Sequence, residues 1–527
     1  MRKIRGGLHL LAMIIGALLA IPVPAYPQSM PVQASENVPD SGRQAVETAE
    51  TAKERALQHK KRGDEFRLRD DIGHAGEEYG KALSLYRRFS AEDRFMMARY
   101  LSWSGRKDEA IRELKVILSE DPGNLDARIH LARCLAWKGD LRGSLQESSK
   151  VLAVSPDNKD ALLVRANALK WSGNPAAGIS IYKGILERGE DFDTRLALSQ
   201  TFLSTGYIRG ARDGAKRLTP GYPYQGKELK SLNAEIDKAT RPAFGAGYSY
   251  YSDSDDNRLD RYTLSTGFWT GAWKWGIGYL DTEAKDPSRN VSDQELALSA
   301  ESRLREWLGV GGTAGVNWTA SDNSGSFFIG GVRAEAKVLD GRIGASVSRN
   351  FFSDTAQLIE NGIWFSEIAS YLEYPLPNRF TVRASYAARD YSDDNRSDDW
   401  QGAIRHQFSL NNPLVAVGYR IRYLDFRRES GGGYFDPACY LSNRIELSVD
   451  YEKGRGYVHL APFIGYQSYQ RRGDSPEGFF GGGEGVIGAH VTNSVDLELH
   501  GEGSDEAGAS ASGYKYYQVG LRMKARF

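Results

Sequence analysis

Four histidines in the second half of the chain could support acid–base chemistry or bind a metal, but their spacing indicates neither. They are His406, His459, His490 and His500. None belongs to an H-E-x-x-H pattern, which places two metal ligands on one helix face, and no G-x-S-x-G turn of a serine hydrolase occurs. The cysteines, Cys134 and Cys439, are too few for a disulfide framework and lack metal-ligand spacing. We therefore expect no enzymatic activity, no cofactor and no metal site.

Acidic stretches and glycine strings offer two further kinds of site. Residues 252–260 and 393–399 are rich in aspartate, but they lack the spaced glycine and terminal glutamate of an EF-hand loop. We interpret them as solvated loops. The glycines at 431–433 and 481–483 do not stand between a strand and a helix, as a phosphate-binding loop requires.

Charged and apolar residues alternate through the second half of the chain. In the last segment, Leu521 and Met523 fall on one face of a strand, while Arg522, Lys524 and Arg526 fall on the other, because strand side chains point alternately to opposite faces. Such a strand suits a wall with lipid outside and water inside. The alternation therefore indicates a membrane barrel with a polar interior.

About sixteen such segments follow one another after Arg241, for example 414–426 and 456–470. Short connections alternate with long charged ones, which is the pattern of an up-and-down barrel. No run here reaches the roughly 18 apolar residues of a membrane helix. We predict an antiparallel transmembrane β-barrel of about 16 strands over residues 241–527, and such a barrel is wide enough to enclose a channel.

The inward faces of these strands carry the candidates for lining a pore. They are Arg383, Arg389, Arg405, Arg420, Arg422, Arg444, Glu446, Asp450, Asp496, Glu498, Arg522 and Lys524. Charges at bilayer depth are tolerated when they face water or one another. Two roles remain open for them: contact with a substrate in the channel, or a structural network that braces the wall.

The longest connection, 427–439, has an unusual composition. Three glycines permit a sharp reversal of the chain, and Tyr434, Phe435, Asp436 and Tyr440 follow. The aromatic rings could fold into the mouth of the barrel and gate or guide sugars, because aromatic faces pack against sugar C–H groups. Alternatively, they form a local core that rigidifies the loop.

The first half of the chain repeats with a period of 34 residues. Trp103, Trp137 and Trp171 recur at this spacing, each followed two residues later by a glycine and preceded by an alanine five residues earlier. This period is typical of tetratricopeptide repeats, which are helical hairpins that cover one another's apolar faces. We predict a solenoid of four to five repeats over residues 44–240. Its tryptophans either pack between helices or line a groove.

The N-terminus has the features of a secretory signal. Arg2, Lys3 and Arg5 precede an apolar stretch, and the small residues around Ala25 suit cleavage there. We therefore assign residues 1–25 to a signal peptide and 26–43 to a disordered linker rich in proline, serine and glutamine. The formal net charge of zero gives no reason to expect a nucleic-acid partner.

Two stretches carry a resemblance to a known family. One is the repeat core 132–139, echoed at 98–105, and the other is 432–440, with the sequence GGYFDPACY. Together with the domain order, they resemble the outer-membrane exporters of bacterial exopolysaccharides, namely the poly-N-acetylglucosamine exporter and the barrel part of the cellulose export subunit. The solenoid here is far shorter, and a smaller related class of outer-membrane barrels fits the length as well.

The resemblance implies a location in the outer membrane, with the repeats in the periplasm. It also implies a porin-like conduit for a polysaccharide chain, with one or more periplasmic proteins bound to the repeats and outer-membrane lipid around the barrel. The alternative is a scaffold or receptor protein that does not conduct, with a periplasmic protein-binding domain. An open conductance state would distinguish the two.

Overall fold

The computed structural model describes residues 41–527 except 321–324, 410–411, 510, 512 and 514. The expected signal peptide, and the expected linker up to residue 40, lie outside the described residues. The chain divides into two compact units between Arg106 and Lys107. None of the described helices is both long and apolar enough to cross a membrane.

The first unit contains three described helices. They are α2 (Ser41–Leu68), α3 (Ile72–Leu85) and α4 (Ala91–Trp103). Tyr79 on α3 is fully buried and donates a hydrogen bond to Asp64 on α2 over 2.8 Å. Helix α3 also buries Ala82.

The second unit begins with eight described helices. They are α5 (Lys107–Glu120), α6 (Leu125–Lys138), α7 (Leu141–Val154), α8 (Lys159–Trp171), α9 (Pro175–Arg188), α10 (Phe192–Ser204), α11 (Ile208–Arg217) and α12 (Pro223–Ala239). Gly139 and Gly173 end their helices with φ of +92° and +91°, a conformation that glycine adopts without steric cost. The repeat spacing in the sequence is therefore a spacing of helix ends.

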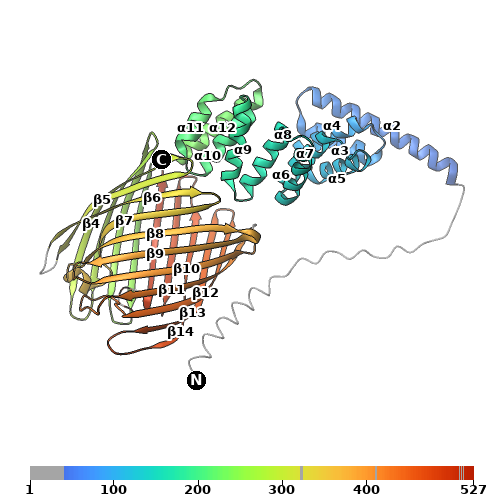
Figure 1. Ribbon diagram of the computed structural model, residues 1–527. Coiled ribbons are helices and arrows are strands. Elements are labelled where there is room, and N and C mark those ends of the chain that lie inside the picture. Colours follow the sequence, from blue (N-terminus) through green and yellow to red (C-terminus); the bar gives the residue numbers. More distant parts are fainter. Residues whose placement is uncertain (1–40, 321–324, 410–411, 510, 512, 514) are drawn as a thin grey trace. The chain divides into compact units, whose positions relative to one another are not determined.

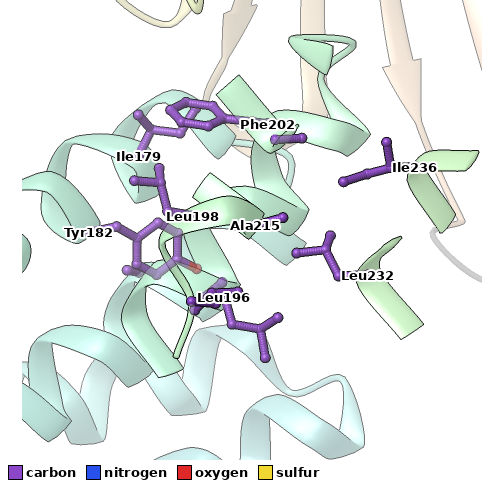
Figure 2. Packing of buried hydrophobic residues seen from close by; sticks show 12 residues of the cluster. Ile179, Tyr182, Leu196, Leu198, Phe202, Ala215, Leu232 and Ile236 are labelled. Carbon is purple, nitrogen blue, oxygen red and sulfur yellow. The ribbon is translucent and has the colours of Figure 1, made fainter. Parts of the chain in front are cut away.

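Helices α8 to α12 share one apolar cluster (Figure 2). Ile179, Tyr182, Leu196, Leu198 and Phe202 belong to it, and Leu232 and Ile236 of α12 join them. Helix α12 thus covers the last hairpin, α10 and α11. This helix follows the last helical hairpin and acts as the cap of the solenoid.

Sixteen strands follow and close into a barrel (Figure 1). They are β1 (Ala243–Asp253), β2 (Arg258–Thr270), β3 (Trp273–Lys285), β4 (Asn290–Arg305), β5 (Leu308–Ala320), β6 (Ser326–Val338), β7 (Gly341–Phe351), β8 (Trp364–Leu376), β9 (Phe380–Tyr391), β10 (Arg396–Gln407), β11 (Leu414–Phe426), β12 (Cys439–Lys453), β13 (Gly456–Gln470), β14 (Glu477–His490), β15 (Val495–Ser504) and β16 (Tyr516–Arg526). Each strand pairs antiparallel with its sequence neighbours, and β1 closes the ring against β16, where Ala243 lies opposite Arg526. The predicted barrel is confirmed.

The two rims of the barrel differ in their connections. One rim, which we call the short-turn end, is made of brief turns such as 271–272, 306–307 and 454–455. The opposite rim, the long-loop end, carries the connections 352–363, 427–438 and 505–515. The first of these contains a short helix, α13 (Ala356–Glu360), that the alternation pattern did not predict.

Candidate functional site

The outer face of the barrel is covered by exposed apolar side chains. Leu298 is 57% exposed, Val332 67% and Ile368 62%, and each stands near the middle of its strand. A folded protein leaves such a continuous belt open only where it meets an apolar phase. The belt therefore identifies this face as the membrane-facing surface of a transmembrane barrel.

The strand register places all twelve pore-lining candidates on the opposite, inner face. Cross-strand partners share a face, so Arg422 lies with Ser442 and Asp399 with Leu424. The same register continues to β16 and groups Arg522 with Glu498, and Lys524 with Asp496.

Most of the inner charges form ion pairs toward the short-turn end. Glu301 accepts from Lys274 over 2.7 Å and from Arg333 over 2.6 Å. On β15, five places from β4 in the closed order, Asp496 lies 2.9 Å from Arg526 and 2.7 Å from the Nδ1 of His490. Further pairs here join Arg342 to Glu373, Asp450 to His459, and Glu498 to Arg522.

A second group of pairs lies toward the long-loop end. Asp399, whose side chain is only 3% exposed, receives two bonds from Arg422, of 3.1 and 2.8 Å, and lies 3.7 Å from Arg389. Arg389 also donates to Glu367 over 2.7 Å. The two parallel bonds from the guanidinium group of Arg422 to the carboxylate of Asp399 hold these two side chains in one relative orientation.

Three of the predicted arginines are held less tightly. Arg383 lies 3.8 Å from Glu373, which is paired with Arg342 as well. Arg405 donates to the hydroxyl of Ser448 over 2.8 Å. Arg420 has no hydrogen bond or ion pair among the described residues. All three, and Lys524, which also lacks an ion pair in the described part of the chain, are on the inner face.

A cavity of about 670 Å³ opens on the inner face between β3 and β10. Its lining includes Glu301, Arg333, Tyr371, Arg383 and Arg389. Charged and hydroxyl groups thus surround a space large enough for several water molecules or part of a sugar chain.

Tyr434, Phe435 and Asp436 of the 427–438 connection are buried, as is Tyr440 at the start of β12. Tyr434 is 2% exposed and its ring stacks on Tyr391 with centroids 4.9 Å apart, while Phe435 meets Tyr440 edge-on at 5.8 Å. Leu358 of α13 packs into the same cluster. The rings therefore do not present open faces to a sugar in this structure, which favours the alternative of a local core.

Polar contacts hold this loop against its neighbours. Arg471 donates to Asp436 over 2.9 Å and to the carbonyl oxygen of Tyr434 over 2.8 Å. Burial raises the pKa of Asp436 even though Arg471 and the backbone N–H of Ser430 favour its charged form. Burial likewise raises the pKa of Tyr434, whose hydroxyl donates to Asp393 over 2.9 Å.

Glu506, which the sequence analysis did not single out, ties another long loop to the inner wall. Its carboxylate accepts from Tyr440 and Ser442 over 2.9 Å and lies 3.1 Å from Arg444. Arg444 also pairs with Glu446 over 3.0 Å. The period-two pattern could have identified Glu301 or Asp399, but it gives no information on a loop residue such as Glu506.

The acidic stretches contain no cation site in the described part of the chain. Asp253 uses one carboxylate oxygen to accept from the backbone N–H groups of Asp255 and Asn257, both over 3.0 Å, and so stabilises its own turn. No group of three or more histidine, cysteine, aspartate or glutamate side chains among the described residues is placed to hold a metal.

The repeat tryptophans are only partly covered. Trp137 is 37% exposed and Trp171 is 44% exposed, and Trp103, in the first unit, is 39% exposed. More than half of each tryptophan is covered and the rest is exposed, so packing between helices and lining a groove both stay open. The alanines at the corresponding positions, Ala132 and Ala166, are the fully buried members of the repeat.

Comparisons with known proteins bear on both parts of the chain. A tetratricopeptide-repeat family model matches residues 104–147. No curated protein matches. Among solved structures, a bacterial polysaccharide outer membrane secretin is similar at a TM-score of 0.45 and 12% identity, over 55% of this chain and 99% of that one. A thermophilic tetratricopeptide-repeat protein of Thermus thermophilus has a TM-score of 0.29 and 18% sequence identity, over 35% of this chain and 98% of that one. A tetratricopeptide-repeat protein of Parabacteroides merdae has a TM-score of 0.27 and 15% identity, over 35% of this chain and 73% of that one.

Proposed function

We propose that the protein is a conduit in the outer membrane through which a secreted polysaccharide leaves the cell. The observation that carries the proposal is the inverted distribution of side chains in a closed ring of sixteen strands, with apolar residues outside and charged residues inside. A barrel of this size encloses more space than its side chains fill. A hydrated, charged wall suits a polymer covered with hydroxyl groups.

The helical repeats have the role of a docking platform in this proposal. Tetratricopeptide solenoids bind other proteins on extended surfaces and supply no chemistry of their own. Strand β1 begins at the short-turn end, directly after α12. The repeats would therefore be in the periplasm, where they bind a protein that delivers or modifies the polymer, and the long loops would face the outside.

Single-channel conductance tests the conduit. The purified full chain, refolded and inserted in a planar bilayer, is expected to give stable open currents that added oligosaccharides interrupt. A folded barrel that never conducts would contradict the proposal.

A second candidate, a scaffold or receptor that does not conduct, is supported by the loop cluster. Leu358, Tyr434 and Phe435 pack against the inward-facing residues Leu424 and Phe426 at the long-loop end, so part of the mouth is covered. Replacement of both Tyr434 and Phe435 by alanine removes the anchors of the 427–438 loop. If the loop closes a conduit, conductance rises in this variant. If the protein is a scaffold, this variant gives no current across the bilayer, and neither does a second variant that lacks residues 427–439.

A further inference from the structure

Arginines on four neighbouring strands form a connected row on the inner face. Arg383 of β9 lies opposite Ala403 of β10, Ala403 lies opposite Arg420 of β11, and Arg420 lies opposite Arg444 of β12. Arg405 stands two residues beyond Ala403 on β10, toward the short-turn end. We call Arg383, Arg405, Arg420 and Arg444 the arginine ladder.

The ladder runs obliquely from one rim of the barrel toward the other. Arg383 is three residues from Phe380, where β9 begins at the short-turn end. Arg420 is at the centre of β11, and Arg444 is five residues from Cys439, where β12 begins at the long-loop end. Neighbouring strands are about 4.8 Å apart, so Arg383 and Arg420 are separated by roughly 10 Å across the sheet.

The four arginines of the ladder differ in the groups that compensate their charge. Arg444 is held by Glu446 and Glu506, at 3.0 and 3.1 Å. By contrast, Arg383 has a distant and shared acid, Arg405 has a neutral hydroxyl, and Arg420 has neither hydrogen bond nor ion pair among the described residues. These three guanidinium groups are exposed on the inner face. Cations that have no close acidic partner concentrate anions along a low-dielectric wall.

The wall across the ring leaves room for a ligand. Strands β2 and β3 lie eight places from β10 and β11 in the closed order, and several of their inner residues are small, such as Thr263, Ser265 and Gly276. A cavity of about 410 Å³ lies along these residues. Of the inner acids without an ion pair among the described residues, Asp293, Glu295 and Glu502 are on β4 and β15, away from the ladder, whereas Glu452 lies at the short-turn end of β12.

The same wall shows which group its arginines bind. Arg422 holds the carboxylate of Asp399 by two bonds, and Arg444 holds the carboxylate of Glu506, which reaches the wall from a loop. A carboxylate matches the planar fork of a guanidinium group better than a hydroxyl does. We propose that the open rungs, Arg383, Arg405 and Arg420, bind the carboxylates of an acidic polysaccharide as it passes, so the cargo is a polymer that contains uronic-acid-like sugars. This inference rests on the proposed function.

Binding of defined oligosaccharides tests the ladder. The full chain in detergent is titrated by calorimetry with an oligogalacturonate, which carries carboxylates, and with maltohexaose, which is neutral. We expect binding of the first only, weakened by added salt because the contacts are ionic. The triple variant Arg383→Gln, Arg405→Gln, Arg420→Gln is expected to bind at least about tenfold more weakly, since charge-assisted hydrogen bonds are the stronger class.

Two control variants separate the ladder from bulk charge. The change Arg87→Gln, Arg88→Gln, Arg112→Gln removes the same charge from exposed positions on the helical repeats and is expected to leave the affinity unchanged. Lysine at the three ladder positions keeps the charge without the fork and is expected to recover part of the affinity. Equal affinity for both oligosaccharides, or an unchanged affinity in the glutamine variant, would overturn the proposal.

Bilayer currents distinguish this proposal from the conduit itself. If the pore conducts but oligogalacturonate and maltohexaose block it equally, the conduit function is supported and carboxylate binding by the arginine ladder is contradicted. If the barrel binds oligogalacturonate through the three arginines but never conducts, carboxylate binding by the ladder is supported and the conduit function is contradicted.

Discussion

The helical repeats and the barrel distribute their apolar side chains in opposite ways. In the repeats, Leu114 and Leu232 are completely covered, while charged residues face outward. In the barrel, Leu298 is 57% exposed and the charged residues face one another inside. The same physical rule, that apolar surface leaves water, gives both results, because the repeats have water outside and the barrel has lipid outside.

Ion pairs have correspondingly different settings in the two regions. Arg188 and Asp157 meet on the repeat surface with side chains 59% and 80% exposed, and such pairs contribute little to stability. Arg422 and Asp399 meet on the inner barrel wall at 20% and 3%. Loss of one member there leaves a covered charge without its partner, which is far more costly.

The largest expected effect comes from the repeat core. Leu232→Ala creates a cavity where α12 covers the last hairpin, and it should lower the free energy of unfolding of the helical part by about 2–5 kcal/mol. Leu298→Ala, on the lipid face, leaves no such cavity and should lower the free energy of unfolding of the barrel by clearly less. Chemical unfolding followed by helical circular dichroism, with a heat-modifiability gel for the barrel, measures both. If both substitutions lower the free energy of unfolding equally, the proposed difference between the repeats and the barrel is contradicted.

A charge on the outer belt tests the lipid assignment. Val332→Arg, near the middle of β6, should destabilise the barrel in lipid by about 2–4 kcal/mol, because arginine is costly at the bilayer midplane. Thr313→Arg, in the middle of β5 but on the inner face, serves as the matched control and should change stability little. Folding in lipid vesicles at increasing urea measures the difference. If the two variants are equally stable, the outer belt does not face lipid.

The smallest effect concerns a helix cap in the repeats. Burial alone would raise the pKa of Asp191, but hydrogen bonds from Lys159 and Thr194 outweigh it and hold the pKa below the usual 3.8. The folded state thus favours the carboxylate, and its contribution to stability is present above pH 4 and lost as the pH falls further. Asp191→Ala should cost about 1 kcal/mol at neutral pH.

The pH dependence of that cap has its own control. Asp191→Asn retains a capping side chain for Thr194 without a titrating group, so its melting temperature should fall less steeply between pH 5 and pH 3 than that of the unaltered protein. A slope unchanged in both variants would show that Asp191 does not contribute to acid sensitivity.

Several elements could be predicted because their signals are local. The segments 414–426 and 456–470 were predicted with the boundaries that β11 and β13 have. Strand periodicity and turn residues lie within a few positions of one another, so each strand can be recognised by itself. The helix ends at Gly139 and Gly173 were visible for the same reason. Helix α13 is too short to show a period, and its apolar residues face a cluster assembled from distant segments.

By itself, the sequence determined which residues share a face of each strand, and therefore that Arg383, Arg405, Arg420 and Arg444 all face inward. Only the tertiary structure decided which of them are compensated, because Glu506 is 62 residues from Arg444 in the chain and meets it only after the loop folds back onto the wall. The burial of Tyr434 against Tyr391 was decided in the same way. Alternation along a strand is a local property of the backbone, whereas the neighbours of a side chain depend on how distant strands and loops come together.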